Sequence, residues 1–476
     1  RMDVASTMVD STIAAVATPA GTGGISIIRI SGPRSIPIAA SIFQPAANAG
    51  RDQTCPLSLA SHRLYYGYIC DDRSGRTVDE VLVAVMRSPR SYTREDVVEI
   101  NCHGGPAAVR AVLDLVLRKG ARLADPGEFT RRAFLNGRID LTQAEAVIDV
   151  INARTHQSIE VAAAQVTGIF RKEIERIRSS LIEILVHNEA VIDFPEEEDV
   201  EQDPSGFKQM LSLRQDAILP LAELLRNYHD GRAIREGFNV AIVGRPNVGK
   251  SSLMNRLLSN ERAIVTPYPG TTRDAIEDEL VIQGVVISLW DTAGLHESVD
   301  PVEAIGMQKT FERAERADLI LFVLEAHRPL SAEDYEIYRK IASKPNVFVL
   351  NKVDLADGCS PADIIPDDWA ESARTPVSAL TGLGIEALRE VISKNLRGDG
   401  SLQAAAATIP NLRQKVLLEG CLEAIEAAVV GLEKRDSPEL VDIHLRQALD
   451  RLDEILGSKV KVEIIDAIFS RFCIGK

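Results

Sequence analysis

The stretch Gly244-Arg-Pro-Asn-Val-Gly249-Lys250-Ser251 decides the fold of the middle of this chain, because it matches G-x-x-x-x-G-K-[ST]. An apolar run, Val240–Val243, precedes it, and a helical pattern, Ser252–Leu258, follows it. Glycines let such a loop curl until its N–H groups face phosphate oxygens, and the helix N-terminus adds partial positive charge. Lys250 would then reach the β- and γ-phosphates, and the Ser251 hydroxyl would ligate Mg²⁺. The pattern predicts a nucleoside triphosphate site.

Later motifs predict that the nucleotide is GTP. Asp291-Thr-Ala-Gly294 ends an expected strand, where Asp291 can hold Mg²⁺ through water and the Gly294 N–H can sense the γ-phosphate. Asn351-Lys-Val-Asp354 follows the expected strand Val347–Leu350. A carboxylate at Asp354 can accept hydrogen bonds from N1–H and N2–H₂ of guanine, whereas adenine would leave it unpaired. Ser378-Ala-Leu380 is placed to support the base with main-chain groups.

The segment Pro269-Gly-Thr-Thr-Arg-Asp274 lies where a first switch loop belongs. Thr272 is the expected second protein ligand of Mg²⁺, and Thr271 is the alternative that spacing does not exclude. Leu295 follows the D-x-x-G segment, where Ras-like GTPases place a Gln that orients the attacking water.

Another group must therefore orient the water. The nearby acids are Glu297, Asp300 and Glu303, each of which could equally be an exposed loop residue. Arg245 and Arg273 are candidates for an arginine finger. A monovalent cation held by oxygen ligands could supply that charge instead.

The composition is that of a soluble multidomain protein with 476 residues. Its 54 basic and 69 acidic residues give a formal net charge of −15, which disfavours a broad basic face for nonspecific nucleic-acid binding. The six cysteines are scattered without a C-x-x-C pair, so we expect reduced thiols. We find no secretory signal and no apolar run of about 18 residues, and we expect a cytoplasmic protein.

The secondary-structure pattern predicts an α/β domain inserted between two parts of a helical domain. Apolar runs at residues 240–243, 285–290, 319–324 and 347–350 predict strands of a parallel sheet. An apolar stripe that includes Ile174, Ile177 and Leu181 predicts a helix, and further helical stretches are expected at 207–235 and after Pro410. Short Val- and Ile-rich strands are expected at residues 13–17, 25–30, 81–85 and 97–100, and one helix is expected at Pro106–Arg118. Thr142-Gln-Ala-Glu145 resembles a capping box that opens a helix, and the acidic segment Asp193–Asp203 is expected to be a solvated loop rather than a metal site. The expected domains are residues 1–120 (N-terminal α/β), 121–237 (helical, first part), 238–396 (G domain) and 397–476 (helical, second part).

Pieces outside these motifs carry a resemblance to a known family. They are Gly21-Thr-Gly-Gly-Ile25, Arg29-Ile-Ser-Gly32, Cys102-His-Gly-Gly-Pro106, Pro126-Gly-Glu-Phe-Thr130, Arg132-Ala-Phe-Leu-Asn136, Asp193-Phe-Pro-Glu-Glu-Glu198 and the terminal Phe472-Cys-Ile-Gly-Lys476. With them the whole chain resembles the MnmE (TrmE) family of tRNA modification GTPases. The G motifs alone would also fit a ribosome-assembly GTPase that binds RNA, which is the alternative function.

The resemblance implies a fold of class α/β and α. It consists of an N-terminal α/β folate-binding and dimerising domain, a helical domain, and a Ras-like P-loop G domain inserted in the latter. It also implies a homodimer in which K⁺ and dimerisation of the G domains stimulate GTP hydrolysis. The partner would be an FAD-dependent MnmG (GidA) subunit in a heterotetramer-type complex. Because the chain is acidic, we expect tRNA to bind mainly through this partner. Together they would place an aminomethyl or carboxymethylaminomethyl group on C5 of the wobble uridine, using 5-formyl- or methylene-tetrahydrofolate.

The resemblance also implies residue roles. Glu303 matches the catalytic glutamate, and Cys473 is either a reactive thiol or a small packing residue. The expected K⁺ ligands are Asn247, Thr266, Tyr268 and Thr271, and the expected folate contacts are Arg29, Glu99, Arg138 and Lys476, with Arg138 standing where the family usually has Lys. The full GTP set from motifs and resemblance is Asn247, Val248, Gly249, Lys250, Ser251, Ser252, Thr266, Pro267, Tyr268, Pro269, Gly270, Thr271, Thr272, Asp291, Thr292, Ala293, Gly294, Asn351, Lys352, Asp354, Ser378, Ala379 and Leu380.

Overall fold

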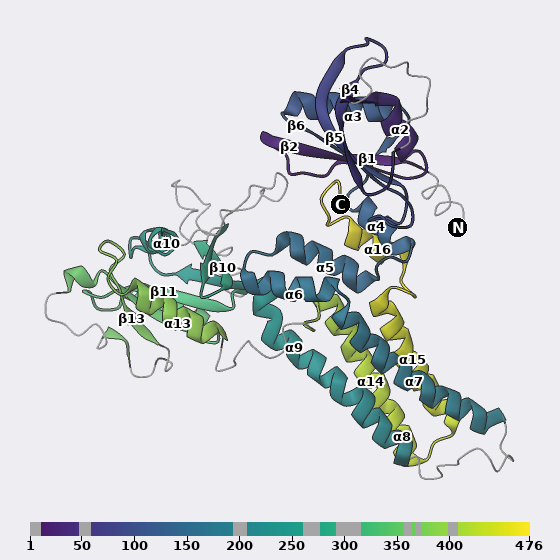
Figure 1. Cartoon of the computed structure of the whole chain (residues 1–476). Helices are drawn as coiled ribbons and strands as arrows, with labels where there is room; N and C mark the ends of the chain where they lie inside the picture. The colour runs from purple at the N-terminus through teal and green to yellow at the C-terminus, as the bar shows by residue number, and fades with distance from the viewer. Residues whose placement is uncertain are drawn as a thin grey trace. The chain divides into compact units, whose positions relative to one another are not determined.

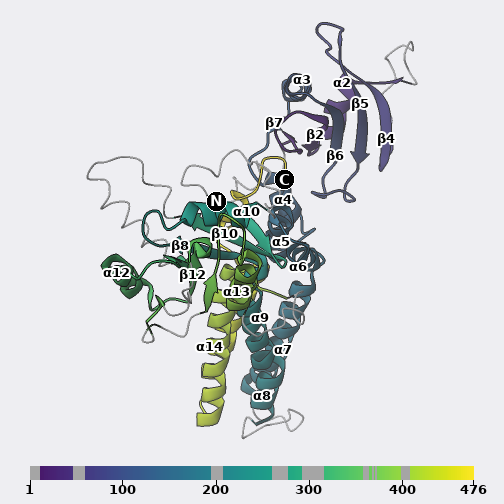
Figure 2. The same ribbon diagram turned by 90° about the vertical axis from the view of Figure 1, so that its left-hand side faces the viewer.

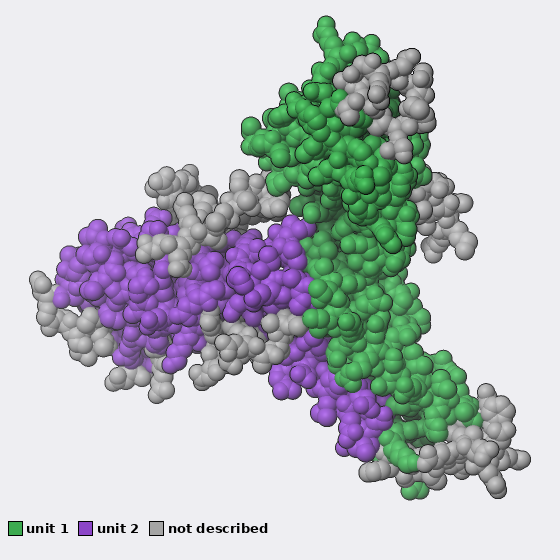
Figure 3. Space-filling model, viewed as in Figure 1, with its two compact units in different colours: residues 1–148, 166–210, 423–476 green, residues 149–165, 211–422 purple. Residues whose placement is uncertain are grey.

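The chain divides into two compact units in a computed structural model (Figure 3). The model describes residues 11–46, 59–193, 207–259, 277–291, 316–356, 364–366, 369, 373–397 and 408–476. Unit 1 comprises Arg1–Ile148, Val166–Met210 and Glu423–Lys476, and unit 2 comprises Asp149–Gln165 and Leu211–Leu422. Unit 1 thus gathers both ends of the sequence, and the chain leaves it twice to build unit 2.

The N-terminal part of unit 1 is a mixed sheet with the strand order β3-β4-β5-β6-β2-β1-β7 (Figure 1). Its strands are β1 (Ile13–Val16), β2 (Gly23–Ser31), β3 (Phe43–Pro45), β4 (Arg63–Cys70), β5 (Thr77–Met86), β6 (Val97–Gly104) and β7 (Arg122–Leu123). Strands β4, β5 and β6 lie side by side in both Figure 1 and Figure 2. The strands predicted at residues 13–17, 25–30, 81–85 and 97–100 and the helix at 106–118 are confirmed.

One face of this sheet packs against helices as a hydrophobic core, and part of the other face is exposed. Helices α2 (Ser35–Ile42) and α3 (Pro106–Arg118) pack on the alternate residues that point inward, such as Ile28 and Val83. The opposite alternation leaves large apolar side chains exposed, namely Ile25, Leu64, Tyr66 and Leu82 on strands β2, β4 and β5. This face of unit 1 therefore carries an exposed apolar patch, whereas Arg29 on the same face of β2 contacts the Gly475 carbonyl.

The rest of unit 1 is helical. Its helices are α4 (Glu128–Leu135), α5 (Leu141–Asn152, whose last turn enters unit 2), α7 (Ile169–Asp193), α15 (Pro438–Leu456) and α16 (Val462–Phe469). The predicted stripe on α7, which includes Ile174, Ile177 and Leu181, is buried. Helices α7 and α15 are joined by Arg178 Nε, which donates to Asp453 at 2.7 Å. Phe472, Phe469 and Leu141 share a second core, so the C-terminal residues pack on α4 and α5.

The predicted cap of helix α5 was placed wrongly. The helix begins at Leu141, so Thr142 lies inside it. The Asp140 carboxylate accepts from the Gln143 N–H at 2.9 Å, and the Gln143 side chain accepts from the Asp140 N–H at 3.2 Å. Asp140 and Gln143 therefore form the reciprocal pair, because an aspartate caps at least as well as a threonine.

Unit 2 contains a second sheet, with the order β13-β12-β11-β8-β10-β9. Its strands are β8 (Phe238–Val243), β9 (Glu277–Ile282), β10 (Val285–Asp291), β11 (Leu319–Glu325), β12 (Asn346–Asn351) and β13 (Arg374–Pro376), and only β9 runs antiparallel to its neighbour. Helices α10 (Lys250–Leu258) and α13 (Ile385–Arg397) contribute to one core, and α12 (Ala332–Ile341) contributes to the other. The four strands predicted in residues 239–396, and their parallel arrangement, are confirmed.

The remaining helices of unit 2 flank this sheet in the sequence. They are α6 (His156–Val166), α8 (Phe207–Ser212, whose first residues belong to unit 1), a π-helical turn at Leu213–Ile218, α9 (Leu219–Glu236), a short 3-10 turn at Val353–Leu355, and α14 (Leu412–Lys434, which continues into unit 1). The predicted helical stretches at 207–235 and after Pro410 are confirmed. Within the described ranges, no helix combines the length and the apolar character that a membrane span requires. Nearly all of the acidic segment 193–203 and of the linker 397–401 lies outside the described residues.

Candidate functional site

The candidate nucleotide site begins where strand β8 turns into helix α10. Gly244 and Gly249 both have positive φ angles, of 157° and 97°. A Cβ on Gly244 would lie 2.5 Å from the Val323 carbonyl oxygen, and one on Gly249 would lie 2.3 Å from Asn351 Nδ2. Only glycine fits these two positions, because both the backbone conformation and the close approach exclude a side chain.

Lys250 is the first residue of α10 and is almost fully buried. Its ammonium group donates to the carbonyl oxygens of Gly244, at 2.8 Å, and Arg245, at 2.7 Å. The positive charge is thus held inside the loop, where an incoming phosphate would meet it. Ser251 and Ser252 follow in the first turn of α10, and both are exposed.

Asn351 ties the loop to the segment expected to face the base. Its side-chain amide donates to the Val248 carbonyl at 2.9 Å, and its side-chain oxygen accepts from the Ala379 N–H at 3.0 Å. Both hydrogen bonds are buried, so loss of the Asn351 side chain would leave the Val248 carbonyl and the Ala379 N–H unsatisfied. Asn351 therefore positions two loops, one that follows strand β8 and one that follows strand β13.

Lys352 fixes the same loop from outside. Its ammonium group donates to the Asn247 carbonyl at 2.7 Å and forms an ion pair with Glu325, the last residue of β11. Burial raises the pKa of Glu325, but the hydrogen bond and charge of Lys352 outweigh burial and lower that pKa overall. Asn247 itself has a positive φ of 63° and an exposed side chain.

The expected base-recognition groups lie at the ends of β12 and β13. Asp354 is exposed, in the turn that follows β12. Ser378 is fully buried and accepts from the Thr381 N–H at 3.1 Å, and Leu380 is 77 % exposed. Arg256 of α10 donates to the Ala379 carbonyl at 3.0 Å and also to the Leu380 carbonyl. The Arg256 guanidinium thus holds the loop at 378–380 through its main-chain carbonyls, and the Asp354 carboxylate remains exposed.

Several of the expected residues lie outside the described part of the chain. They are Thr266, Pro267, Tyr268, Pro269, Gly270, Thr271, Thr272, Thr292, Ala293, Gly294 and Glu303. Asp291 is described only in its backbone, as the end of strand β10. Their roles stay predictions.

The four expected folate contacts come together in unit 1. Arg29 of β2 and Glu99 of β6 face each other in the sheet register, and the guanidinium donates to the carboxylate at 2.8 Å. Arg29 lies 5.6 Å from the centres of the Tyr92 and Phe129 rings, and Arg138 lies 4.7 Å from that of Tyr92. Tyr92 therefore links the two arginines by cation–π contacts.

The C-terminal residues complete this cluster. Arg29 donates to the Gly475 carbonyl at 3.1 Å, and the Phe129 N–H donates to the carbonyl of Lys476 at 3.2 Å. Burial lowers the pKa of Lys476, and the nearby charge of Arg29 lowers it further against the opposing charge of Glu99. The Cys473 side chain is exposed, while its carbonyl accepts from the Gly127 N–H at 3.4 Å.

Sequence reasoning missed the residues that hold these sites in place. Glu325 and Arg256 belong to no motif. Asp334 closes the capping box that Ser331 opens at the start of α12, but that pattern does not show that its buried carboxylate accepts from Arg245 at 2.8 Å. Tyr92 stands beside Thr93 in a loop with no recognisable spacing. The sequence did carry one signal for Glu325, which is the charged last residue of an otherwise apolar strand. Burying such a charge is costly without a partner, so a nearby cation could have been expected.

Comparisons with known proteins identify the family. A model of the MnmE helical domain matches residues 141–473, and a model of the GTP-binding protein TrmE N-terminus matches residues 12–138. The chain is 44 % identical to the tRNA modification GTPase MnmE of Desulfotalea psychrophila, over 98 % of both chains. It is 45 % identical to that of Geobacillus kaustophilus, over 98 % of this chain and 99 % of the relative.

Among solved structures, one of Era from Aquifex aeolicus bound to GDP and aluminium fluoride matches 39 % of this chain and 66 % of its own, with 32 % identity and a TM-score of 0.29. The sequence matches extend over both flanks of the G motifs, which are the parts that separate this family from ribosome-assembly GTPases. Hence this chain belongs to the MnmE (TrmE) family of tRNA modification GTPases.

Proposed function

We propose that this chain hydrolyses GTP, with K⁺ as an activating ion, to drive modification of the wobble uridine of tRNA together with an FAD-dependent partner of the MnmG type. One observation carries the proposal. A cradle organised around Lys250 and Asn351 and a second site around Arg29 and Lys476 occur in one chain of the MnmE family. A reaction that uses both GTP and a one-carbon donor requires two binding sites, one for the nucleotide and one for the carbon donor.

The nucleotide site supports GTP binding through groups that are already held in place. Lys250 can exchange its two carbonyl partners for phosphate oxygens without moving out of the loop. Asp354 is exposed beside the loop that Asn351 and Arg256 hold, so its carboxylate can accept the two donors of guanine. Mg²⁺ suits the hydroxyl of Ser251, with Thr272 as the second expected ligand, and would neutralise charge on the β- and γ-phosphates when bound.

The proposed hydrolytic groups rest on the family resemblance. Glu303 would orient the attacking water, since Leu295 cannot. Oxygen atoms of Asn247, Thr266, Tyr268 and Thr271 would hold K⁺, which would supply the positive charge of an arginine finger when bound. Homodimerisation is supported by the apolar sheet face of unit 1, where Ile25 and Leu64 are 66 % and 65 % exposed.

The second site fits a tetrahydrofolate derivative such as 5-formyl- or methylene-tetrahydrofolate. The Glu99 carboxylate can accept hydrogen bonds from the amino and ring N–H groups of a pterin. Arg29 orients that carboxylate from the neighbouring strand. Lys476 and Arg138 bring positive charge for the carboxylates of the folate. We propose this N-terminal folate-binding domain at residues 1–120, followed by the helical domain in two parts, 121–237 and 397–476, around a G domain at 238–396.

The hydrolytic proposal is tested by steady-state GTPase assays of the purified chain in K⁺ and in Na⁺. We expect a faster rate in K⁺ and, for Glu303→Ala, near-normal GTP affinity with most turnover lost. Equal rates in the two salts would remove the ion from the mechanism. A Glu303→Ala variant that hydrolyses GTP at the parental rate would remove the glutamate.

A further inference from the structure

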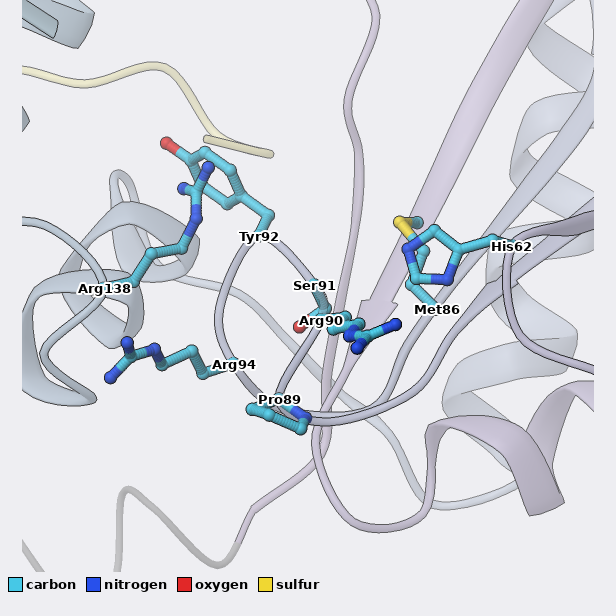
Figure 4. A pocket seen from close by; sticks show the side chains of 8 residues that line it. All are labelled: His62, Met86, Pro89, Arg90, Ser91, Tyr92, Arg94 and Arg138. Carbon is cyan, nitrogen blue, oxygen red and sulfur yellow. The ribbon is translucent and has the colours of Figure 1, made fainter. Parts of the chain in front are cut away.

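A pocket with an unusual charge lies beside the proposed folate site in unit 1. It has a volume of about 430 Å³ and is lined by His62, Met86, Pro89, Arg90, Ser91, Tyr92, Arg94 and Arg138. Figure 4 shows Arg138 and Arg94 on one side of the 89–92 loop, and His62 with Met86 on the other side. Three guanidinium groups and one imidazole line this pocket, and no carboxylate does.

The three arginines are available to a ligand. All three are exposed, and the structure pairs none of them with a carboxylate among the described residues. Arg94 donates to the carbonyl of Asn136 at 2.9 Å, and Arg138 rests on the Tyr92 ring. A concentration of positive charge in a hollow of an acidic chain raises the local concentration of anions. The pocket is thus suited to a ligand that carries several negative charges.

The pocket is continuous with the Arg29 cluster. Tyr92 belongs to both, since its ring lies 4.7 Å from the Arg138 guanidinium carbon and 5.6 Å from that of Arg29. Arg138 is itself one of the proposed folate contacts. A ligand bound at Arg29 and Glu99 therefore reaches the pocket by passing one aromatic ring, that of Tyr92.

We propose that this pocket binds the γ-linked glutamate tail of the tetrahydrofolate, an inference that rests on the proposed folate site. Each γ-linked glutamate leaves one free α-carboxylate, so a short tail presents a series of anions along a flexible chain. Arginine suits such a ligand, because its planar guanidinium can hold a carboxylate by two parallel hydrogen bonds. Arg138 would meet the first carboxylate beside Tyr92, and Arg94 and Arg90 would meet those that follow.

An RNA backbone is a less suitable occupant. Binding of RNA phosphates depends on basic side chains spread along a face, and the chain carries a formal charge of −15. The positive groups here are instead confined to one small pocket. Binding of RNA in this pocket would therefore contradict the assignment.

The test measures binding of the monoglutamate and triglutamate forms of 5-formyltetrahydrofolate to the full chain by titration calorimetry. We expect the triglutamate to bind about tenfold more tightly, which corresponds to about 1.4 kcal/mol. The double variant Arg90→Gln, Arg94→Gln is expected to lose this gain and to keep the monoglutamate affinity within about twofold. Its retained monoglutamate binding also shows that the variant is folded. Arg110→Gln changes an exposed arginine on helix α3, is the matched control and should keep the gain.

The possible results distinguish the tail pocket from the folate site. Equal affinity of the wild-type chain for both forms would overturn the assignment of the pocket while leaving the folate site intact. Absence of binding by both forms would overturn the folate site, and the tail pocket with it. If the double variant keeps the gain for the triglutamate but binds tRNA more weakly in a filter assay, the pocket belongs to RNA and our assignment is wrong.

Discussion

The guanidinium of Arg29 donates to the carbonyl oxygen of Gly475 at 3.1 Å, although 446 positions separate the two residues in the sequence. Arg29 also pairs with Glu99 on the adjacent strand, so one side chain joins the N-terminal sheet to the C-terminal residues. The ammonium group of Lys476 follows directly and is partly buried there. The proposed folate site is therefore complete only when the last residues of the chain have docked.

The variant Gly475→Ala should release these last residues. Gly475 has a φ of 94°, and a Cβ there would lie 2.2 Å from the Val16 carbonyl oxygen, so the tail must move. We expect at least a tenfold loss of folate affinity and faster trimming by carboxypeptidase. Gly24→Ala is the control, because nothing lies within 4 Å of its added Cβ. Unchanged affinity in Gly475→Ala would show that tail docking is irrelevant to the site.

Glu128→Gln should destabilise unit 1 in a pH-dependent manner. Burial raises the pKa of Glu128, but hydrogen bonds from Arg122 and the Asp125 N–H, with the charge of Arg132, lower that pKa overall. A lowered folded-state pKa stabilises the fold above the unfolded value, near pH 4.3, and the stabilisation is lost as the pH falls through the folded-state value. We expect the variant to lose about 3 kcal/mol at neutral pH.

The measurement is chemical denaturation of both proteins, followed from neutral pH down to about pH 3, below the ordinary glutamate pKa. The difference in unfolding free energy between wild type and Glu128→Gln should shrink toward the acidic end. A difference that stays constant over this range would contradict the role of the carboxylate charge.

Asn351→Ala should weaken GTP binding by releasing the two loops that its side chain joins. The substitution leaves the Val248 carbonyl and the Ala379 N–H without a buried partner, at a cost of about 1–3 kcal/mol each. We expect GTP affinity to fall by more than about tenfold in fluorescence titrations. Asn395→Ala removes a similar amide from an exposed position and should leave affinity unchanged.

Asp354→Asn should change which base is preferred. The amide cannot accept from both donors of guanine, but its NH₂ group can donate to the carbonyl at position 2 of xanthine. Competition titrations should show a loss of GTP affinity and a gain for xanthosine triphosphate. Glu336→Gln, an exposed change on helix α12, should leave the preference for guanine intact. A guanine preference retained in Asp354→Asn would place base recognition elsewhere.

Glu325→Gln should loosen the phosphate loop from outside. Without its ion pair, Lys352 loses the group that holds it over the Asn247 carbonyl. We expect the Kd for GTP to rise by about tenfold or more, because a charge-assisted hydrogen bond contributes about 1.5–3 kcal/mol. Glu333→Gln on α12 changes an exposed acid and is the control. Equal GTP affinities of the two variants would show that the Glu325–Lys352 ion pair does not support the phosphate loop.

The sequence allowed the local elements and the phosphate loop to be predicted, because both depend on short-range patterns. Continuous apolar runs located strands such as β8 and β11. The spacing of Gly244, Gly249 and Lys250 could be read because the backbone of the phosphate loop requires glycine at two of these positions. The cap of helix α5 failed because two overlapping patterns were present, and the Asp140 pattern prevailed over that of Thr142.

The long-range contacts could not be predicted in this way. No pattern relates Arg29 to Gly475 or Glu325 to Lys352, since such pairs depend on how distant segments close on one another. The arginine pocket was missed for the same reason. Arg90 and Arg94 are close in sequence, but His62 and Arg138 join them only through the fold.

The most direct test of the account is nucleoside analysis of tRNA from cells that lack this chain and are complemented with wild type, Lys250→Ala or Arg29→Ala. The account predicts that wild type restores the C5-substituted wobble uridine and that each variant leaves it absent, because both the nucleotide site and the folate site are required. Wobble uridine profiles that are the same with and without the wild-type chain would contradict it.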